Sequence, residues 1–300
     1  SSTRPEAGDF EHITLEAHGL KFSALAMGEG PVVLCLHGFP DHRWSFRHQL
    51  PALAQAGYRA IAPQLRGYEP SSQPERRVAA YHPLLLASDV IVWAKNLGEG
   101  EPVHLVGHDW GGMITYTACQ LMPELFRTAC AIAVPSNQAV EDGIRRYPVQ
   151  LRNSWYMFFF QLRGLADRVV EARDFAFIEK LWRDWSPGWE WDPADMERLK
   201  TSFREPGVLW CALAYYRAMI NFTLPASKKL RETLRDPIEV PTLAITGAAD
   251  GCLDTRLFEC MDPKLFPAGL CIERIEQGGH FVHQEQPEAV NKLLVEWLAR

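Results

Sequence analysis

Asp109 stands between two glycines in the pattern Gly-x-Asp-x-Gly, after an apolar run typical of a strand and before a run compatible with a helix. A serine in this pattern is a nucleophile at a sharp strand-to-helix turn. Gly107 and Gly111 suit so tight a turn because they add no side chain to its flanks. The N–H groups at the start of the next helix favour negative charge. We therefore predict that Asp109 is a nucleophile.

A nucleophile of this kind works with a base and an acid that orients the base. His280 follows two glycines at the end of a strand-like run and is the candidate general base, with His283 as the alternative. Asp250 comes just after another such run and would orient His280 and stabilise its cation, with Asp254 as the competitor.

The choice of aspartate narrows the reaction. A carboxylate that attacks a saturated carbon forms an alkyl ester, which activated water can hydrolyse at its carbonyl, whereas a serine would leave a stable ether. Asp109 therefore predicts an epoxide or an alkyl halide as substrate. The backbone N–H groups of Phe39 and Trp110 are placed to bind the oxyanion of the tetrahedral intermediate. Side chains and water suffice for this scheme, so we expect no metal and no cofactor.

The elements that must position these groups follow a regular alternation. Short apolar runs typical of buried strands alternate with helical patterns, which predicts βαβ units in a mostly parallel sheet with helices on both faces. Functional groups collect at the carboxyl ends of the strands in such sheets. The expected strands span 10–17, 20–27, 32–36, 58–62, 103–107, 128–134, 242–246 and 270–275, and the expected helices span 44–55, 83–97, 112–121 and 287–300.

The alternation fails over residues 135–225. Aromatic and charged helical patterns dominate there, with Trp182, Trp185, Trp189 and Trp191 close together and no strand signal. We predict a helical cap over 135–225, inserted into an α/β core formed by 1–134 and 226–300. The chain order of nucleophile, acid and histidine is that of the α/β-hydrolase triad, so the predicted fold is an α/β-hydrolase fold.

Composition excludes several other classes. The chain has 300 residues, 47% of them hydrophobic and 23% charged, a profile typical of globular proteins. Its formal charge of −6 argues against nucleic acid or an anionic membrane as partner. Seven cysteines without a CxxC pair favour buried thiols in a reducing compartment over disulfides or a zinc site. With no signal-peptide pattern and no apolar run of spanning length, we expect a cytoplasmic monomer or homodimer.

Four motifs spread over nearly the whole chain resemble those of the soluble epoxide hydrolases of the α/β-hydrolase fold. They are His37-Gly38-Phe39-Pro40, Arg66-Gly67-Tyr68, Gly107-His108-Asp109-Trp110-Gly111-Gly112 and Gly279-His280. The chain departs from the family's pattern at Gln64, where an aspartate is usual, and at Glu69, where a glycine is usual. Both positions lie outside the triad, so they bear on the structure of a loop more than on activity.

The resemblance also implies two cap tyrosines that hold the epoxide oxygen and protonate the leaving alkoxide. Residues 155–161 resemble the segment with the first, which places it at Tyr156, and residues 214–217 resemble the segment with the second, at Tyr216. Tyr215 is the neighbouring alternative to Tyr216. A phenol with a pKa of ~10 is a hydrogen-bond donor at neutral pH.

The resemblance thus implies hydrolysis of an apolar epoxide to a vicinal diol through an alkyl-aspartate ester. We expect the substrate, a small hydrophobic epoxide, to bind between cap and core in contact with His37, Phe39, Pro40 and Trp110.

Two other functions stay open. A haloalkane or haloacid dehalogenase would use the same aspartate, with the indole N–H of Trp110 on the halide and the tyrosines as bystanders. Phe39 stands where a haloalkane dehalogenase has a halide-binding asparagine, which argues against that version. A non-catalytic ligand receptor on the same fold would have no need of a complete nucleophile, base and acid.

Overall fold

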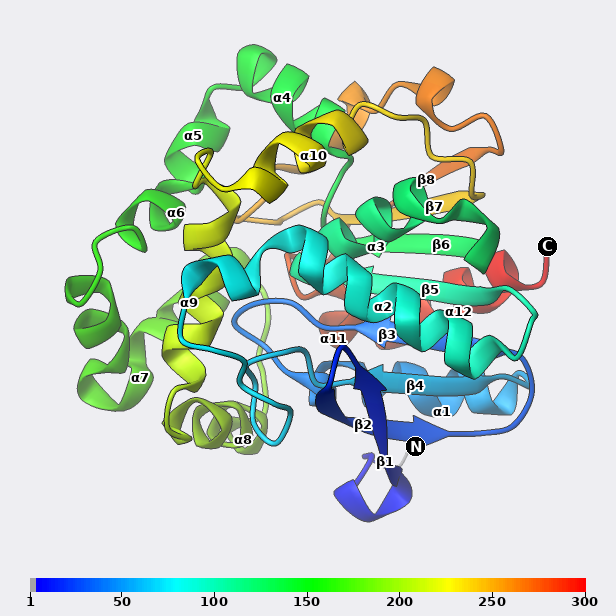
Figure 1. Cartoon of the computed structure of the whole chain (residues 1–300), viewed down its shortest axis with the longest axis horizontal. Helices are drawn as coiled ribbons and strands as arrows, with labels where there is room; N and C mark the ends of the chain where they lie inside the picture. Colours follow the sequence, from blue (N-terminus) through cyan, green and yellow to red (C-terminus); the bar gives the residue numbers. More distant parts are fainter. Residues whose placement is uncertain (1–3) are drawn as a thin grey trace.

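The computed structural model describes residues 4–300, and in this range a single eight-stranded sheet organises the core (Figure 1). Residues 1–3, part of the polar N-terminal stretch without a signal-peptide pattern, lie outside the described residues. The strand order is β1-β2-β4-β3-β5-β6-β7-β8. The strands are β1 (Glu11–Ala17), β2 (Leu20–Met27), β3 (Val32–Leu36), β4 (Arg59–Pro63), β5 (Val103–His108), β6 (Phe126–Ile132), β7 (Thr242–Gly247) and β8 (Leu270–Ile275).

The sheet is mostly parallel, as its short apolar runs predicted. β1 and β2 form an antiparallel hairpin, β2 also pairs antiparallel with β4, and the remaining neighbouring strands, from β4 to β8, are parallel. The inner strands are buried on both faces, which explains why their sequences are mainly apolar instead of alternating. In β3, for example, Val33 and Cys35 pack into one hydrophobic core, and Leu34 and Leu36 pack into the other.

Helices cover both faces of the sheet (Figure 1). One face carries α2 (Pro83–Gly98) and α3 (Trp110–Leu121), which pack on each other, and the other carries α1 (Gln49–Gln55) and α12 (Pro287–Leu298), next to the short α11 (Val282–Glu285). The predicted helix over 44–55 is divided, because a 3₁₀ turn (Arg43–Phe46) precedes α1. The predicted helix over 112–121 begins two residues earlier, at Trp110, directly after Asp109.

Between β6 and β7 the chain forms only helices among its described residues, and these make up the helical insert. They are α4 (Asn137–Arg146), α5 (Val149–Asn153), α6 (Trp155–Phe159), α7 (Leu165–Trp185), α8 (Pro193–Arg204), α9 (Val208–Met219) and α10 (Pro225–Thr233). Figure 1 shows α5 to α9 grouped beside one end of the sheet. The last helix, α10, packs back on α2 and α3 of the core.

Two further properties concern the expected environment of the protein. Within residues 4–300 no helix has both the length and the apolar character needed to cross a bilayer. All seven cysteines lie in the part of the chain that the structure describes, and each is a free thiol.

Candidate active site

Asp109 occupies a strained turn between β5 and α3. Its backbone angles are φ 54° and ψ −117°, outside the regions that side-chain-bearing residues prefer. A Cβ on Gly107 would lie 1.9 Å from the carbonyl oxygen of Gly111, and a Cβ on Gly111 would lie 2.0 Å from that of Leu36. Both glycines are therefore required by close backbone contacts, and the Asp109 side chain stands at the apex of the turn.

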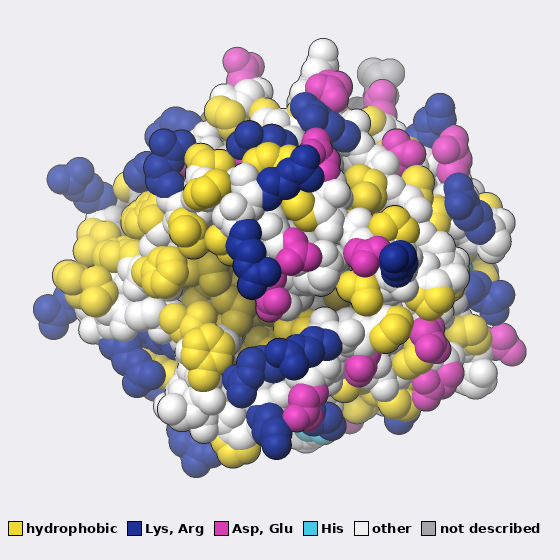
Figure 2. Space-filling model, turned by 90° about the horizontal axis from the view of Figure 1, so that it is seen from above, with side chains coloured by type: hydrophobic (Ala, Val, Ile, Leu, Met, Phe, Trp, Pro, Cys, Tyr) yellow, Lys and Arg dark blue, Asp and Glu magenta, His cyan; other side chains and the backbone are white. Residues whose placement is uncertain are grey.

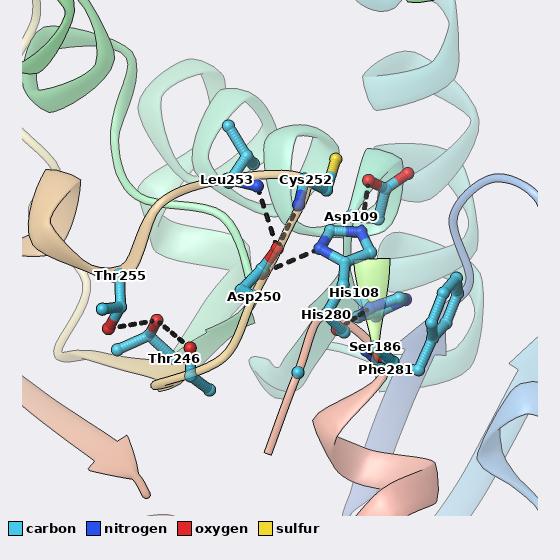
Figure 3. A network of polar contacts seen from close by, with 12 residues as sticks. His108, Asp109, Ser186, Thr246, Asp250, Cys252, Leu253, Thr255, His280 and Phe281 are labelled. Carbon is cyan, nitrogen blue, oxygen red and sulfur yellow. Dashed lines mark hydrogen bonds and ion pairs between the residues drawn. The ribbon is translucent and has the colours of Figure 1, made fainter. Parts of the chain in front are cut away.

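The three residues expected to form a triad are in contact (Figure 3). Nε2 of His280 lies 2.9 Å from Oδ1 of Asp109, and Nδ1 of His280 lies 2.9 Å from Oδ2 of Asp250. The other oxygen of Asp250 accepts hydrogen bonds from the N–H groups of Cys252 and Leu253, at 2.8 and 2.9 Å. Asp250 is thus fixed by its own loop and aimed at the imidazole.

Neither Asp254 nor His283, the alternatives to Asp250 and His280, takes part in the triad hydrogen bonds. Asp254 accepts a hydrogen bond from the backbone N–H of Arg256 and forms an ion pair with the Arg256 side chain. His283 is buried, and its Nε2 lies 2.6 Å from the hydroxyl of Ser45. The geometry therefore separates Asp250 and His280 from their competitors, which spacing alone did not do.

The charges of the triad are coupled. Burial by itself lowers the pKa of His280, but the adjacent carboxylates of Asp250 and Asp109 outweigh it and raise the pKa to about 10. Burial by itself raises the pKa of Asp109, but hydrogen bonding to His280 outweighs it, so the net pKa of that carboxyl is lowered. At neutral pH the pair is therefore an imidazolium beside a carboxylate, and the carboxylate is ionised as a nucleophile requires.

The loop after β3 reaches the same carboxylate. The backbone N–H of Phe39 donates a hydrogen bond of 2.9 Å to Oδ2 of Asp109. The N–H of Trp110 belongs to the first turn of α3, where backbone donors have no partner within the helix. The backbone N–H groups of Phe39 and Trp110 are the two donors predicted to form an oxyanion hole. That of Phe39 contacts the Asp109 carboxylate.

Asp109 faces an apolar cavity of about 320 Å³ between the core and the helical insert. A second hollow of about 460 Å³, beside Arg43, Glu69 and Arg198, contains none of the triad, so we assign the site to the cavity at Asp109. The apolar side chains that line this cavity include Trp110, Met113, Ile144, Leu151, Met157, Phe158, Met219 and Leu253.

Tyr156 and Tyr216 line the same cavity as Asp109. Their ring centroids are 5.7 Å apart, and the Tyr216 ring also packs edge-on against Trp110. Burial raises the pKa of both phenols well above the ordinary value, so both hydroxyls carry a proton at neutral pH. Tyr215 points elsewhere, because its hydroxyl donates a 2.6 Å hydrogen bond to the carbonyl oxygen of Arg66.

Three of the four expected substrate contacts, His37, Phe39 and Pro40, are placed differently. His37 and Pro40 are not among the described residues that line the cavity. The His37 ring lies between the Gly38 carbonyl oxygen (2.9 Å) and the Leu65 N–H (3.1 Å), and burial lowers its pKa to about 4. A neutral ring with both nitrogens engaged supports the loop instead of binding substrate.

The other two members of the motif after β3 also contact protein side chains. The carbonyl oxygen of Pro40 accepts a hydrogen bond from the indole N–H of Trp182. The Phe39 ring does not line the cavity either, since it packs edge-on against Phe160 and Tyr216. Phe39 can thus reach the site through its backbone N–H while its ring supports the cavity wall.

The unusual Gln64 bonds to backbone groups of two segments, the 3₁₀ turn that begins at Arg43 and its own loop after β4. Its side-chain oxygen accepts a hydrogen bond from the Arg43 N–H, and its amide nitrogen donates one to the Glu69 carbonyl, both at 2.9 Å. Nearby, Arg66 and Asp89 form a buried bidentate ion pair. At Gln64 the departure from the family's pattern therefore falls on a side chain that holds backbone groups in place, outside the triad.

Sequence reasoning missed two residues next to the triad. The carbonyl oxygen of Trp185, at the end of α7, accepts hydrogen bonds from the N–H groups of both Gly251 and His280, at 3.1 and 3.0 Å. The insert thereby holds the loops of the acid and the base together. Cys252 lies 3.3 Å from the hydroxyl of Tyr156 through its sulfur. The tryptophan cluster was visible in the sequence, but no pattern linked its backbone to His280.

Two groups of described residues bring possible metal-ligating atoms within 4.8 Å of one another: Asp109, Cys252 and His280, and Asp41, His108 and His283. The first coincides with the triad, where Asp109 and His280 already contact each other. In the second, Asp41 and His283 both hydrogen-bond the hydroxyl of Ser45. In both groups, hydrogen bonds therefore explain why most of these side chains lie close together, and no bound ion is needed for it.

The chain belongs to the alpha/beta hydrolase family, whose profile matches residues 33–293. It is 30% identical over 291 residues to the AB hydrolase superfamily protein YfhM of Bacillus subtilis (strain 168), covering 95% of this chain and 96% of that protein. The prediction of an α/β-hydrolase fold is thus confirmed.

Several relatives carry a more specific name. Epoxide hydrolase 3 of Xenopus tropicalis is 30% identical over 298 residues, 97% of this chain and 78% of that protein. The crystal structure of epoxide hydrolase VrEH1 from Vigna radiata matches with a TM-score of 0.80 at 27% identity, covering 98% of this chain and 99% of that one. The resemblance to epoxide hydrolases therefore extends over nearly the whole chain.

Proposed function

We propose that this protein is an epoxide hydrolase that converts an apolar epoxide to a vicinal diol through an ester on Asp109. The observation that carries the proposal is the arrangement of Tyr156 and Tyr216 with Asp109. Two protonated phenols line the same apolar cavity as a buried, ionised carboxylate. An epoxide needs both a nucleophile at carbon and a proton donor at oxygen, and this cavity offers both.

In the first step the Asp109 carboxylate attacks one epoxide carbon and the carbon–oxygen bond of the ring breaks. The electron pair of that bond goes to the oxygen, which takes a proton from Tyr156 or Tyr216. The products are a hydroxyalkyl ester and a tyrosinate. Attack by a held carboxylate on a held epoxide also gains from proximity, because both partners are already oriented.

Formation of the ester prepares His280 for the second step. The ester has no charge, so one of the two carboxylates that raise the pKa of His280 is lost. The imidazolium then releases its proton, which restores the tyrosinate to tyrosine. The neutral imidazole, oriented by Asp250, is a general base.

In the second step His280 removes a proton from water, and the oxygen of that water attacks the ester carbonyl. The N–H groups of Phe39 and Trp110 bind the oxyanion. Collapse of the intermediate expels the diol alkoxide, which takes the proton of the Asp109 carboxylic acid. Asp109 is again a carboxylate and His280 again a cation, so atoms and charges balance.

We further propose that the helical insert acts as a cap, with 135–225 as cap and 1–134 with 226–300 as core. It supplies both tyrosines, and its α7 holds the base through Trp185. The apolar lining of the cavity supports a hydrophobic epoxide as substrate.

The test is a parallel assay of the purified protein with styrene oxide and with 1-bromobutane, scored for diol and for bromide. Diol without bromide is expected. Bromide without diol would overturn the proposal in favour of a dehalogenase and make Trp110 the residue to substitute. Tight binding of either compound with no product would favour a receptor.

A further inference from the structure

The segment that carries Tyr156 also exposes an unusual number of large apolar side chains. Leu151, Trp155, Phe158, Leu162 and Leu165 are 52%, 40%, 64%, 51% and 55% exposed, and we call them the apolar patch. Trp155 and Phe158, three residues apart in α6, lie on one side of that helix. Leu151 precedes them in α5, and Leu162 and Leu165 follow at the turn into α7. Figure 2, which views the molecule from above, shows hydrophobic side chains gathered beside a hollow, with Lys and Arg side chains and some Asp and Glu side chains around it.

The charge of this segment is opposite to that of the whole chain. The net charge is −6 overall, yet residues 143–169 contain five exposed arginines and one acidic residue, Asp167, and the exposed acidic residues Glu141, Asp142 and Glu171 flank this stretch. Asp167 is engaged in an ion pair with Arg217. The five, which we call the arginine fringe, are Arg145, Arg146, Arg152, Arg163 and Arg168. Arg145 forms an ion pair with Asp142, so the other four supply most of the cationic surface. The average charge of the chain therefore hides a local cationic surface around the apolar patch.

The apolar patch continues into the cavity at Asp109. Leu151 and Phe158 are exposed members of the patch and also line that cavity, where they lie with Ile144 and Met157. A molecule that leaves an apolar phase at the patch can therefore enter the cavity along apolar side chains.

We propose that the apolar patch and the arginine fringe dock this protein on the surface of an anionic lipid bilayer. Exposed Trp, Phe and Leu flanked by Arg is the composition that binds at the membrane interface, where the apolar residues enter the boundary and the cations contact anionic headgroups. Docking places the cavity entrance against the lipid, where an apolar substrate concentrates. The docking surface does not depend on which reaction the cavity performs.

A second copy of the chain fits this surface less well. In a symmetric dimer the same surface faces itself, so five arginines would meet five arginines. A coiled-coil partner would need a continuous helix, and α5, α6 and α7 are separated by turns at Ser154 and at 160–164. The cationic fringe is instead complementary to anionic lipid.

The experiment is co-sedimentation of the full chain with vesicles of phosphatidylcholine alone or of phosphatidylcholine with phosphatidylserine. The first variant is Arg152→Glu/Arg163→Glu/Arg168→Glu. Its matched control is Lys95→Glu/Arg127→Glu/Lys292→Glu, which reverses three exposed cations on the core and changes the net charge equally. The second variant is Leu162→Ser/Leu165→Ser, which removes apolar surface that does not line the cavity.

We expect binding to the phosphatidylserine vesicles that weakens with salt. It should fall about 100-fold or more in the arginine variant, since each cation contributes about 1 kcal/mol near an anionic surface. It should persist in the control and fall in the leucine variant. Absent binding, equal binding to neutral vesicles, or equal loss in the control would overturn the proposal. A dimer in light scattering that either patch variant dissociates would overturn it in favour of a second copy.

Discussion

His280 and Asp109 lie in direct contact, with Nε2 of the ring 2.9 Å from Oδ1 of the carboxylate. The contact makes each group's charge depend on the other. The carboxylate, together with Asp250, holds a proton on the imidazole, and the imidazolium keeps the carboxylate ionised. In the proposed reaction the negative charge of Asp109 keeps His280 protonated until Asp109 is alkylated. His280 therefore becomes a base only after the ester has formed.

Replacement of His280 by glutamine should separate the two steps. Asp109 keeps its attacking oxygen, but no base activates water, so His280→Gln should accumulate the alkyl-enzyme. Mass spectrometry of the intact protein after exposure to a good epoxide substrate should show one added substrate per chain. No adduct, from a substrate that the wild type turns over, would argue against the ester.

Replacement of Asp109 by asparagine should abolish the first step. We expect freshly made Asp109→Asn to lose about 10⁴-fold or more in kcat, a loss typical of a removed nucleophile. Mass spectrometry must verify that the amide has not deamidated. Steady turnover by the verified amide would be incompatible with a covalent mechanism.

The two tyrosines should act on the epoxide, whereas their neighbour should not. Tyr156→Phe and Tyr216→Phe should each lower kcat/KM by about 10²-fold, and the double variant by more, because general-acid catalysis contributes about 10²–10⁴-fold. Tyr215→Phe is the matched control. It loses a buried hydrogen bond to Arg66, so it should cost about 1 kcal/mol of stability and leave kcat/KM near that of the wild type. A larger kinetic effect at Tyr215 than at Tyr216 would reverse the assignment.

Asp250 should act through the pKa of His280. In Asp250→Asn the carboxylate that raises that pKa is gone, so the imidazole should lose its proton at lower pH. The rise of single-turnover ester hydrolysis with pH should move to lower pH, while its maximal rate falls because the ring is held less well. Asp254→Asn should leave both unchanged. If the pH profile shifted in Asp254→Asn and not in Asp250→Asn, Asp254 would be the residue that orients His280.

Buried neutral histidines should make the fold sensitive to acid. Burial lowers the pKa of His37 to about 4, whereas the unfolded chain binds this proton near pH 6.5. The unfolded state thus holds more protons between these values, so the free energy of unfolding should fall by up to about 1.4 kcal/mol per pH unit for this group as pH drops below about 6.5. Urea unfolding between pH 7 and pH 5 should show a shallower decline for His37→Gln. An unchanged slope would mean that the folded and unfolded chains bind this proton at the same pH, which would contradict a buried ring with a lowered pKa.

Much of the fold was determined by local sequence. The strands and the final helix follow from short apolar runs and periodicity, and the runs are continuous because parallel strands are buried on both faces. The elbow at Asp109 was also readable, since Gly107 and Gly111 are the residues that its close backbone contacts allow. In both cases the residues that cause the local structure are close in sequence to the pattern that predicts it.

Tertiary structure decided what depends on long-range contact. Asp250 and Asp254 are four residues apart, and only the folded loop shows which one faces His280. Tyr215 and Tyr216 are adjacent, and the orientation of α9 sends one to Arg66 and the other to the cavity. The sequence predicts that His37 contacts substrate, whereas in the structure its ring lies between two backbone groups. Residue type and order determined the chemistry available to this chain, whereas packing between distant segments decided which side chains can take part.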